Sequence, residues 1–246
     1  MFKNFKELKR NLKKSQDNYK VIKVSLLGDT ATQFLSIALQ GTAIDRGYKL
    51  DLFEAEYNQV ERQVLDSTSE LYAHQAQYTI IFQSTHKWLE HYAMADASRR
   101  NYFAKERLEF LRHACMSISG KIIYYNYPEI EDSIFGSYAN KVDDSFIFQL
   151  RKFNYELMLL AQELPNLYIC DIAGLQNKFG RDWMFDASMI SIVRLATYGR
   201  ASKDRIISVD TYTDASNIQS RPNLFCNPAI SQRYRLGISC AKSINS

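Results

Sequence analysis

The feature that most constrains the fold is a regular alternation of short apolar runs with longer helical patterns. The apolar runs are typical of buried strands and lie at Val21–Leu27, Lys49–Phe53, Tyr78–Phe82, Lys121–Tyr125 and Leu167–Cys170. Helical patterns follow them at 30–39, 63–72, 88–116 and 145–164. Strands that alternate with helices predict a parallel sheet covered on both faces. Right-handed crossovers make this α/β chain a three-layer α/β/α sandwich.

The N-terminal segment has a pattern of its own. Phe2, Phe5, Leu8 and Leu12 recur at helical spacing, and lysines occupy the other face. Residues 1–20 hold seven Lys/Arg and two acids, a net charge of +5. One interpretation is a helix that lies on a membrane surface. The other is a helix that docks on the domain, which the modest apolar face favours.

Composition limits the classes of protein to which the chain can belong. The net charge is +4 for the whole chain, so the part after residue 20 carries about −1, which argues against a nucleic-acid groove. No apolar signal region and no stretch of about 18 apolar residues is present, so we expect a cytoplasmic protein without a membrane span. Its four cysteines (Cys115, Cys170, Cys226 and Cys240) lack CxxC spacing and are expected to be reduced.

Residues that directly follow the strands matter most, because ligands of parallel α/β sheets bind at the carboxyl ends of the strands. Gly28-Asp29-Thr30 follows the first strand and opens a helix. Glycine lets the backbone approach a ligand closely, and a helix start offers free N–H groups to an oxyanion. Thr30 is either a nucleophile or a helix cap, and the spacing alone favours the cap. A nucleophile would also need a base and an orienting acid.

Four more polar residues are predicted at the same edge. Asn58 and Asn126 follow the second and fourth strands, where each is a candidate hydrogen-bond donor to a substrate carbonyl or phosphate. Thr85 and His86 follow the third strand, and His86 is either a base in a new position or a loop residue, which is the commoner case. No cluster has metal-ligand spacing and no glycine-rich phosphate loop is present, so we expect neither a metal nor a cofactor.

The polar motifs resemble those of the SGNH (GDSL-type) hydrolases. Gly28-Asp29-Thr30 is similar to the family's first block, Gly-Asp-Ser, with threonine in the place of the nucleophile. Asp186-Ala187-Ser188-Met189 stands where the family has Asp-x-x-His, so Asp186 matches the acid and Met189 replaces the base. Residues 83–86 replace the Gly-x-Asn-Asp block, with Thr85 at the asparagine. The resemblance implies a flavodoxin-like fold with a degenerate catalytic site.

Longer phrases resemble the N-terminal domain of FkbH-like (HAD subfamily IIIC) proteins over about residues 20–200. These phrases are LFEAEYNQV, VLDSTSELYA, FGSYANKVDDSF and QLRKFNYELMLLAQELPNLYICDIAGL. This resemblance implies that a glyceryl unit is loaded from a phosphorylated glycerate onto an acyl carrier protein, or a related handling of acyl groups. A HAD-type phosphatase domain usually follows. The nearest match to its Asp-x-Asp-x-Thr signature, at 208–212, lacks the first Asp and the Thr, so we expect that half to be absent.

We therefore predict a basic helix at 1–20, an SGNH-like domain at 21–200 and an unassigned tail at 201–246. The domain is expected to bind a small acyl or glyceryl group and to meet an acyl carrier protein or a HAD-type phosphatase partner. The alternatives are an active esterase or acyltransferase that uses Thr30, and a non-catalytic interaction domain. One cleft is expected to collect the site residues, Gly28, Asp29, Thr30, Asn58, Thr85, His86, Asn126 and Asp186.

Overall fold

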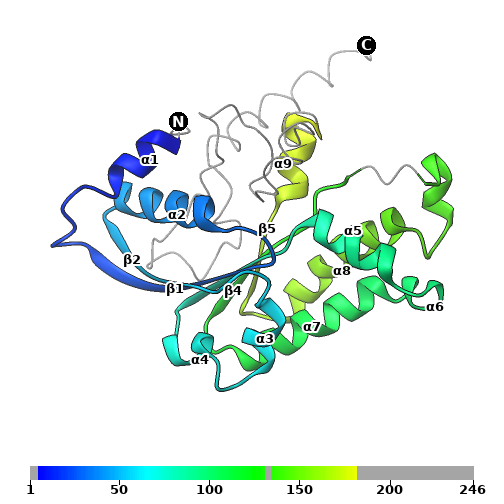
Figure 1. Ribbon diagram of the computed structural model, residues 1–246, viewed down its shortest axis with the longest axis horizontal. Helices are drawn as coiled ribbons and strands as arrows, with labels where there is room; N and C mark the ends of the chain where they lie inside the picture. The colour runs from blue at the N-terminus through cyan, green and yellow to red at the C-terminus, as the bar shows by residue number, and fades with distance from the viewer. Residues whose placement is uncertain (1–4, 131–133, 182–246) are drawn as a thin grey trace, which may run out of the picture.

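The computed structural model describes residues 5–130 and 134–181, and its centre is a five-stranded sheet (Figure 1). The strands are β1 (Lys20–Gly28), β2 (Tyr48–Glu54), β3 (Tyr78–Phe82), β4 (Lys121–Tyr125) and β5 (Leu167–Cys170). Every pairing is parallel, and the order is β2-β1-β3-β4-β5. This order is flavodoxin-like, and the chain reverses its direction of winding between β1 and β3. The predicted α/β sandwich with a parallel sheet is confirmed.

Helices cover both faces of the sheet (Figure 1). Before and between the first strands lie α1 (Phe5–Asn11) and α2 (Gln33–Asp45). The connections from β2 to β5 carry α3 (Val60–Leu65), α4 (Glu70–His74), α5 (Thr85–Met94), α6 (Ala97–Arg100), α7 (Phe103–Ser117), the 3-10 helix η1 (Gly136–Lys141) and α8 (Phe146–Glu163). A last helix, α9 (Ile172–Phe179), follows β5. One face of the sheet meets α2 and α9, and the other meets α3, α4, α5, α7 and α8.

Strands were predicted more accurately than helices. The bounds of β3, β4 and β5 agree with the prediction, and β1 and β2 are one residue longer at each end. The helical pattern at 63–72 is wrong as one helix, because the Asp66 carboxylate accepts the N–H and the hydroxyl of Thr68 and turns the chain between α3 and α4. The pattern at 88–116 breaks twice, at Ala95 and Asp96, which follow α5, and at Asn101, which follows the end of α6 at Arg100.

Two helices at the ends of the described chain need explanation. We did not predict α9, although the Asp171 side chain caps it by accepting the N–H of Gly174 at 2.9 Å. The shorter α1 packs on α2, since Leu8 is buried and Asn11 Nδ2 donates to the Gly41 carbonyl at 3.1 Å. The structure therefore shows the N-terminal helix docked on the domain. The strands suggested at 205–209 and 234–240 lie outside the described residues.

The larger core lies on the face covered by α5, α7 and α8, with Trp88 at its centre. The Trp88 ring stacks on Tyr127 at a centroid distance of 4.6 Å and meets Phe146 and Phe153 edge-on at 5.6 and 5.4 Å. Aromatic pairs at these separations add to the free energy gained by burial. This packing fixes the start of α5 and the loop after β4, which both lie at the carboxyl edge of the sheet.

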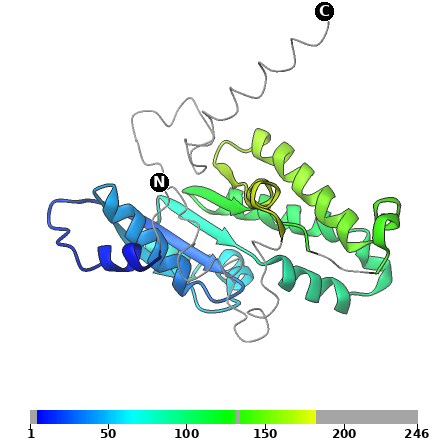
Figure 2. The same cartoon turned by 90° about the horizontal axis from the view of Figure 1, so that it is seen from above.

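The opposite face is covered more sparsely by the described helices. Viewed from above, α2 lies over the β1 and β2 side and α9 lies over another part of the sheet (Figure 2). Leu35 and Leu39 of α2 pack on Ile22, Val24 and Leu26 of β1. Within the described residues, no helix is long and apolar enough to cross a membrane.

Candidate functional site

The candidate site lies at the carboxyl edge, where β1 and β3 end side by side. The Asp29 N–H donates to the Phe82 carbonyl at 3.3 Å, so the two strand ends are joined beyond the sheet itself. This is the point at which the winding of the sheet reverses, and ligands of open α/β folds bind in the crevice there. The Gly28-Asp29-Thr30 motif and the Gln83-Ser84-Thr85-His86 segment are therefore neighbours in the fold.

Asp29 is a buried carboxyl group, 6% exposed. Its two oxygens both lie near the Ser84 N–H, which donates to them at 2.9 and 3.0 Å. Burial raises the pKa of Asp29 to about 7, although the Ser84 hydrogen bond and the charge of Arg107 act in the opposite direction. Near neutral pH, Asp29 therefore divides between a protonated form that donates a hydrogen bond and a charged form that only accepts.

Thr30 is also buried, 8% exposed, and its Oγ1 has no hydrogen-bond partner in the described part of the protein. The predicted helix cap is wrong: α2 begins at Gln33, Thr32 is its N-cap residue, and the Thr32 hydroxyl donates to Glu54 Oε1 at 2.5 Å. Buried hydroxyl groups are normally hydrogen-bonded. An unpartnered one at the carboxyl edge, where ligands of open α/β folds bind, is therefore a candidate ligand contact.

Gly28 makes the tight turn before Asp29 possible. A Cβ atom at this position would lie 2.3 Å from the Thr32 methyl group and 3.6 Å from the Phe82 carbonyl oxygen. Thr32 cannot easily turn away, because its hydroxyl is held by Glu54. The absence of a side chain at Gly28 therefore leaves the space that the Thr32 methyl group occupies.

A hydrogen-bonded chain runs through the interior below these strand ends. The Tyr124 hydroxyl donates to Gln83 Oε1 at 3.0 Å, and it lies 2.9 Å from the Tyr127 hydroxyl, which must be the donor in that pair. Gln83 Nε2 reaches Glu61 Oε1 at 3.4 Å, and Arg107 Nη1 reaches the same oxygen at 3.3 Å. Burial raises the pKa of both tyrosines, so both remain neutral donors.

The other residues predicted after β3, Thr85 and His86, lie at the start of α5. The Thr85 hydroxyl donates to the Pro128 carbonyl at 3.0 Å, which links the ends of β3 and β4. His86 is the second residue of α5, and burial lowers its pKa. No described imidazole lies within hydrogen-bond distance of Thr30 Oγ1. The arrangement of nucleophile and base that an ester hydrolase uses is not formed by Thr30 and His86.

Asn126 and Asn58 have different surroundings. Asn126 Oδ1 accepts the N–H groups of Ile172 and Ala173 at 2.7 and 3.0 Å, and its Nδ2 donates to Asp171 at 2.8 Å. It therefore fastens β4 to the start of α9. Asn58 is exposed in the turn after β2, with φ 57, a conformation that asparagine tolerates better than most residues. Asp186 lies outside the described residues, as does Met189.

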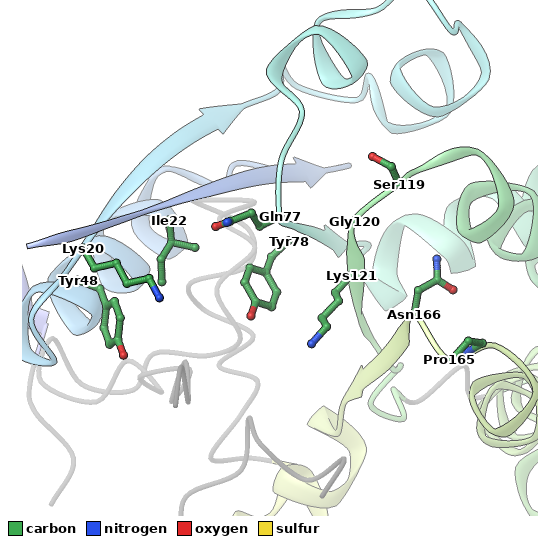
Figure 3. Close-up of a pocket in the computed structure, with 10 residues that line it drawn as sticks. All are labelled: Lys20, Ile22, Tyr48, Gln77, Tyr78, Ser119, Gly120, Lys121, Pro165 and Asn166. Atoms are coloured by element: carbon green, nitrogen blue, oxygen red, sulfur yellow. The ribbon is translucent and has the colours of Figure 1, made fainter. Parts of the chain in front are cut away.

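A separate hollow of about 450 Å³ opens at the opposite, amino edge of the sheet (Figure 3). Lys20, Tyr48, Tyr78 and Lys121 are the first residues of β1 to β4 and line it. Figure 3 shows that the side chains of Tyr48, Tyr78 and Lys121 point to the same side of the sheet. None of the predicted site residues lines this hollow. Its size alone does not make it the candidate site.

The sequence of this chain matches that of one known family. The family described as "FkbH, N-terminal domain" matches residues 23–197. The chain belongs to the FkbH N-terminal domain family. The predicted resemblance to FkbH-like proteins is thereby confirmed. Among curated proteins, none matches this chain.

A solved structure supports the same family assignment. It is described as the N-terminal part of the protein BF1531 from Bacteroides fragilis, containing a phosphatase domain and complexed with Mg. The two chains are 51% identical with a TM-score of 0.76, over 78% of this chain. The match covers 51% of the BF1531 chain, so this chain spans about half the length of that structure. Within residues 5–130 and 134–181, no group of three or more potential ligands could hold a metal ion.

Sequence reasoning missed Glu61, Gln83, Ser84 and Arg107. Arg107 carries the only detectable signal. It stands between Phe103 and Leu111 at spacings of four, on the stripe that α7 buries. A charged residue on a buried helical stripe needs a partner inside the protein. The others are ordinary polar residues whose contacts come from distant parts of the chain.

Proposed function

We propose that this FkbH N-terminal domain binds a small acyl or glyceryl group at the carboxyl edge of its sheet and does not hydrolyse simple esters. The observation that carries the proposal is the buried, unpartnered Thr30 hydroxyl beside the buried Asp29 carboxyl group. A hydroxyl and a carboxyl that titrates near neutral pH offer one donor each to the carbonyl oxygen of a thioester.

Binding is favoured over hydrolysis because the base is missing from the described site. Efficient acyl transfer needs a base that removes the proton of the nucleophile and an acid that orients the base. No described imidazole hydrogen-bonds to Thr30 Oγ1. Thr30 is also β-branched, which restricts its approach to a carbonyl carbon.

The partners follow from the family relationship. The BF1531 structure contains a phosphatase domain. The resemblance to FkbH-like proteins implies that a glyceryl unit is loaded onto an acyl carrier protein. We therefore expect this domain to present its ligand to an acyl carrier protein and to act beside a phosphatase-like partner. The exposed Lys6, Lys9, Arg10 and Lys13 of the N-terminal segment form a basic surface for an acidic carrier helix.

The binding experiment compares two buried threonines. Isothermal titration with acetyl-pantetheine should give a dissociation constant that Thr30→Val weakens about three- to tenfold, since one neutral hydrogen bond is lost. Thr79→Val is the matched control, because Thr79 Oγ1 is also buried without a described partner but lies within β3. Equal affinities of wild type and Thr30→Val would refute the site.

The hydrolysis experiment separates the proposal from its alternatives. With a small activated ester, wild type and Thr30→Val should both match the background rate. A wild-type rate well above background that Thr30→Val abolishes would establish an esterase, and loss in His86→Ala would identify a relocated base. Absence of both turnover and ligand binding, with capture of a carrier protein that weakens in high salt, would indicate an interaction domain.

A further inference from the structure

Arg107 is a buried cation whose hydrogen-bonding capacity is mostly unused. Its side chain is 12% exposed, and Nη1 donates to Glu61 Oε1 at 3.3 Å. A guanidinium group carries five N–H donors, and the contact with Glu61 uses one of them. Among the described residues, Glu61 is the one side chain that accepts a hydrogen bond from Arg107.

Glu61 holds this position loosely. Its side chain is 47% exposed, and the contacts from Arg107 and Gln83, at 3.3 and 3.4 Å, are longer than usual for hydrogen bonds between nitrogen and oxygen. Little free energy is therefore lost when another oxyanion takes its place, since Glu61 can turn into solvent.

Space for a ligand lies next to the pair. A hollow of about 460 Å³ is lined by Glu61 and Arg107, and Trp88, Phe103 and Phe110 supply apolar walls. His91 also lines the hollow, as do Arg99 and Glu106, which pair with each other at 3.0 Å, so apolar and polar side chains share its walls. Glu61 Oε1 also lies 3.4 Å from Nε2 of Gln83, which directly precedes Ser84, and the Ser84 N–H bonds to Asp29. The Glu61–Arg107 pair is therefore near the candidate site, and the charge of Arg107 acts to lower the pKa of Asp29.

The guanidinium remains charged in this environment. Burial acts to lower the pKa of Arg107, but the carboxyl groups of Glu61 and Asp29 act to raise it, and an arginine side chain stays protonated in proteins. A cation with one loose anionic contact attracts a negatively charged group strongly, because interactions between charges are stronger away from water.

We infer that Arg107 binds an oxyanion of the ligand, a phosphate or a carboxylate, when Glu61 gives up its contact. The inference rests on the proposed function and makes its ligand an anionic one. Arg107 is well suited to this role because its planar fork binds two oxygens of a phosphate or carboxylate at once.

The test measures binding of four probes by isothermal titration: inorganic phosphate, glycerol 3-phosphate, glycerate and 3-phosphoglycerate. Arg107→Met should weaken binding of the preferred anion at least about tenfold, since a charge-assisted hydrogen bond is lost. Glu61→Gln should strengthen it, because the competing carboxylate is removed. Arg112→Met is the matched control, since Arg112 lies on the same helix and pairs with Glu163 at the surface.

The probes distinguish the two sources of the oxyanion. Tighter binding of glycerol 3-phosphate than of glycerate would assign the contact to phosphate, and the reverse order would assign it to carboxylate. Unchanged affinity in Arg107→Met, or no anion binding by the wild type, would overturn the inference. If Arg107→Met does not fold, the absence of any gain in Glu61→Gln would overturn it.

Failure of this inference is separable from failure of the proposed function. If Thr30→Val weakens binding of acetyl-pantetheine while Arg107→Met leaves the binding of every anion unchanged, the acyl site is supported and the oxyanion contact is refuted. If both variants bind their probes with the affinity of the wild type, both proposals are refuted.

Discussion

The two edges of the sheet are formed by the same parallel strands but differ in how their polar groups are held. At the carboxyl edge, Asp29, Gln83 and Tyr124 are buried and bonded to other residues of the edge. At the amino edge, Lys20 and Lys121 begin strands beside an open hollow. The hollows near the two edges have similar volumes, about 450 and 460 Å³. Burial of polar groups, rather than the size of a hollow, therefore distinguishes the candidate site.

The largest expected effect concerns the packing beneath the carboxyl edge. Trp88→Ala should lower the free energy of unfolding by about 3–5 kcal/mol, because it leaves a cavity among Tyr127, Phe146 and Phe153. Urea denaturation measures this loss. The comparison variant is Tyr78→Ala at the half-buried amino edge, which should cost less. Equal losses would contradict the difference between the two edges.

The second prediction concerns the pH dependence that Asp29 confers. Its pKa rises from 3.8 to about 7 on folding, so between these values the folded protein holds a proton that the unfolded chain has released. Stability from this group is therefore present below about pH 4 and falls as the pH rises to 7, by up to about 4 kcal/mol.

Asp29→Asn isolates that contribution, since asparagine keeps an acceptor for the Ser84 N–H but does not titrate. Unfolding by urea at intervals from pH 4 to pH 7 should show a shallower fall in stability for the variant than for the wild type. Parallel curves would mean that Asp29 titrates alike in the folded and unfolded states.

The third prediction compares two glycines. A Cβ at Gly120 would lie 2.5 Å from the Ala76 carbonyl oxygen, and a Cβ at Gly28 would lie 2.3 Å from the Thr32 methyl group. Both alanine variants should lose about 1–3 kcal/mol through overpacking. Only Gly28→Ala should also weaken acetyl-pantetheine binding, which titration measures. Equal weakening in Gly120→Ala would place the ligand elsewhere.

The smallest effect is expected at the amino edge. Lys121 Nζ lies 5.6 and 6.0 Å from the ring centroids of Tyr168 and Tyr78, a cation–π arrangement at a partly exposed site. Lys121→Met should change stability by less than about 1 kcal/mol and leave anion binding unchanged. Loss of anion binding in this variant would move the oxyanion site from Arg107 to the hollow of Figure 3.

The sequence predicted the position in the fold correctly where residues directly follow strands. Asp29 and Thr30 lie at the carboxyl edge because they come directly after β1 in the sequence. For Thr85 and Asn126, the sequence predicted the edge of the sheet but not the hydrogen-bond partners. Their side chains bond to Pro128 and Asp171, which are 43 and 45 residues away in the sequence. Sequence spacing gives no information about such contacts.

The sequence by itself determined the parallel α/β sandwich, because buried strands and amphipathic helices have different periods and alternate along this chain. It also determined the family, through phrases that follow one another in order. Only the tertiary structure decided which polar residues are buried together. The raised pKa of Asp29 and the loose pair of Glu61 and Arg107 arise where segments from β1, β3, α3 and α7 meet. Desolvation and charge act through space, and the distances that set them exist only after folding.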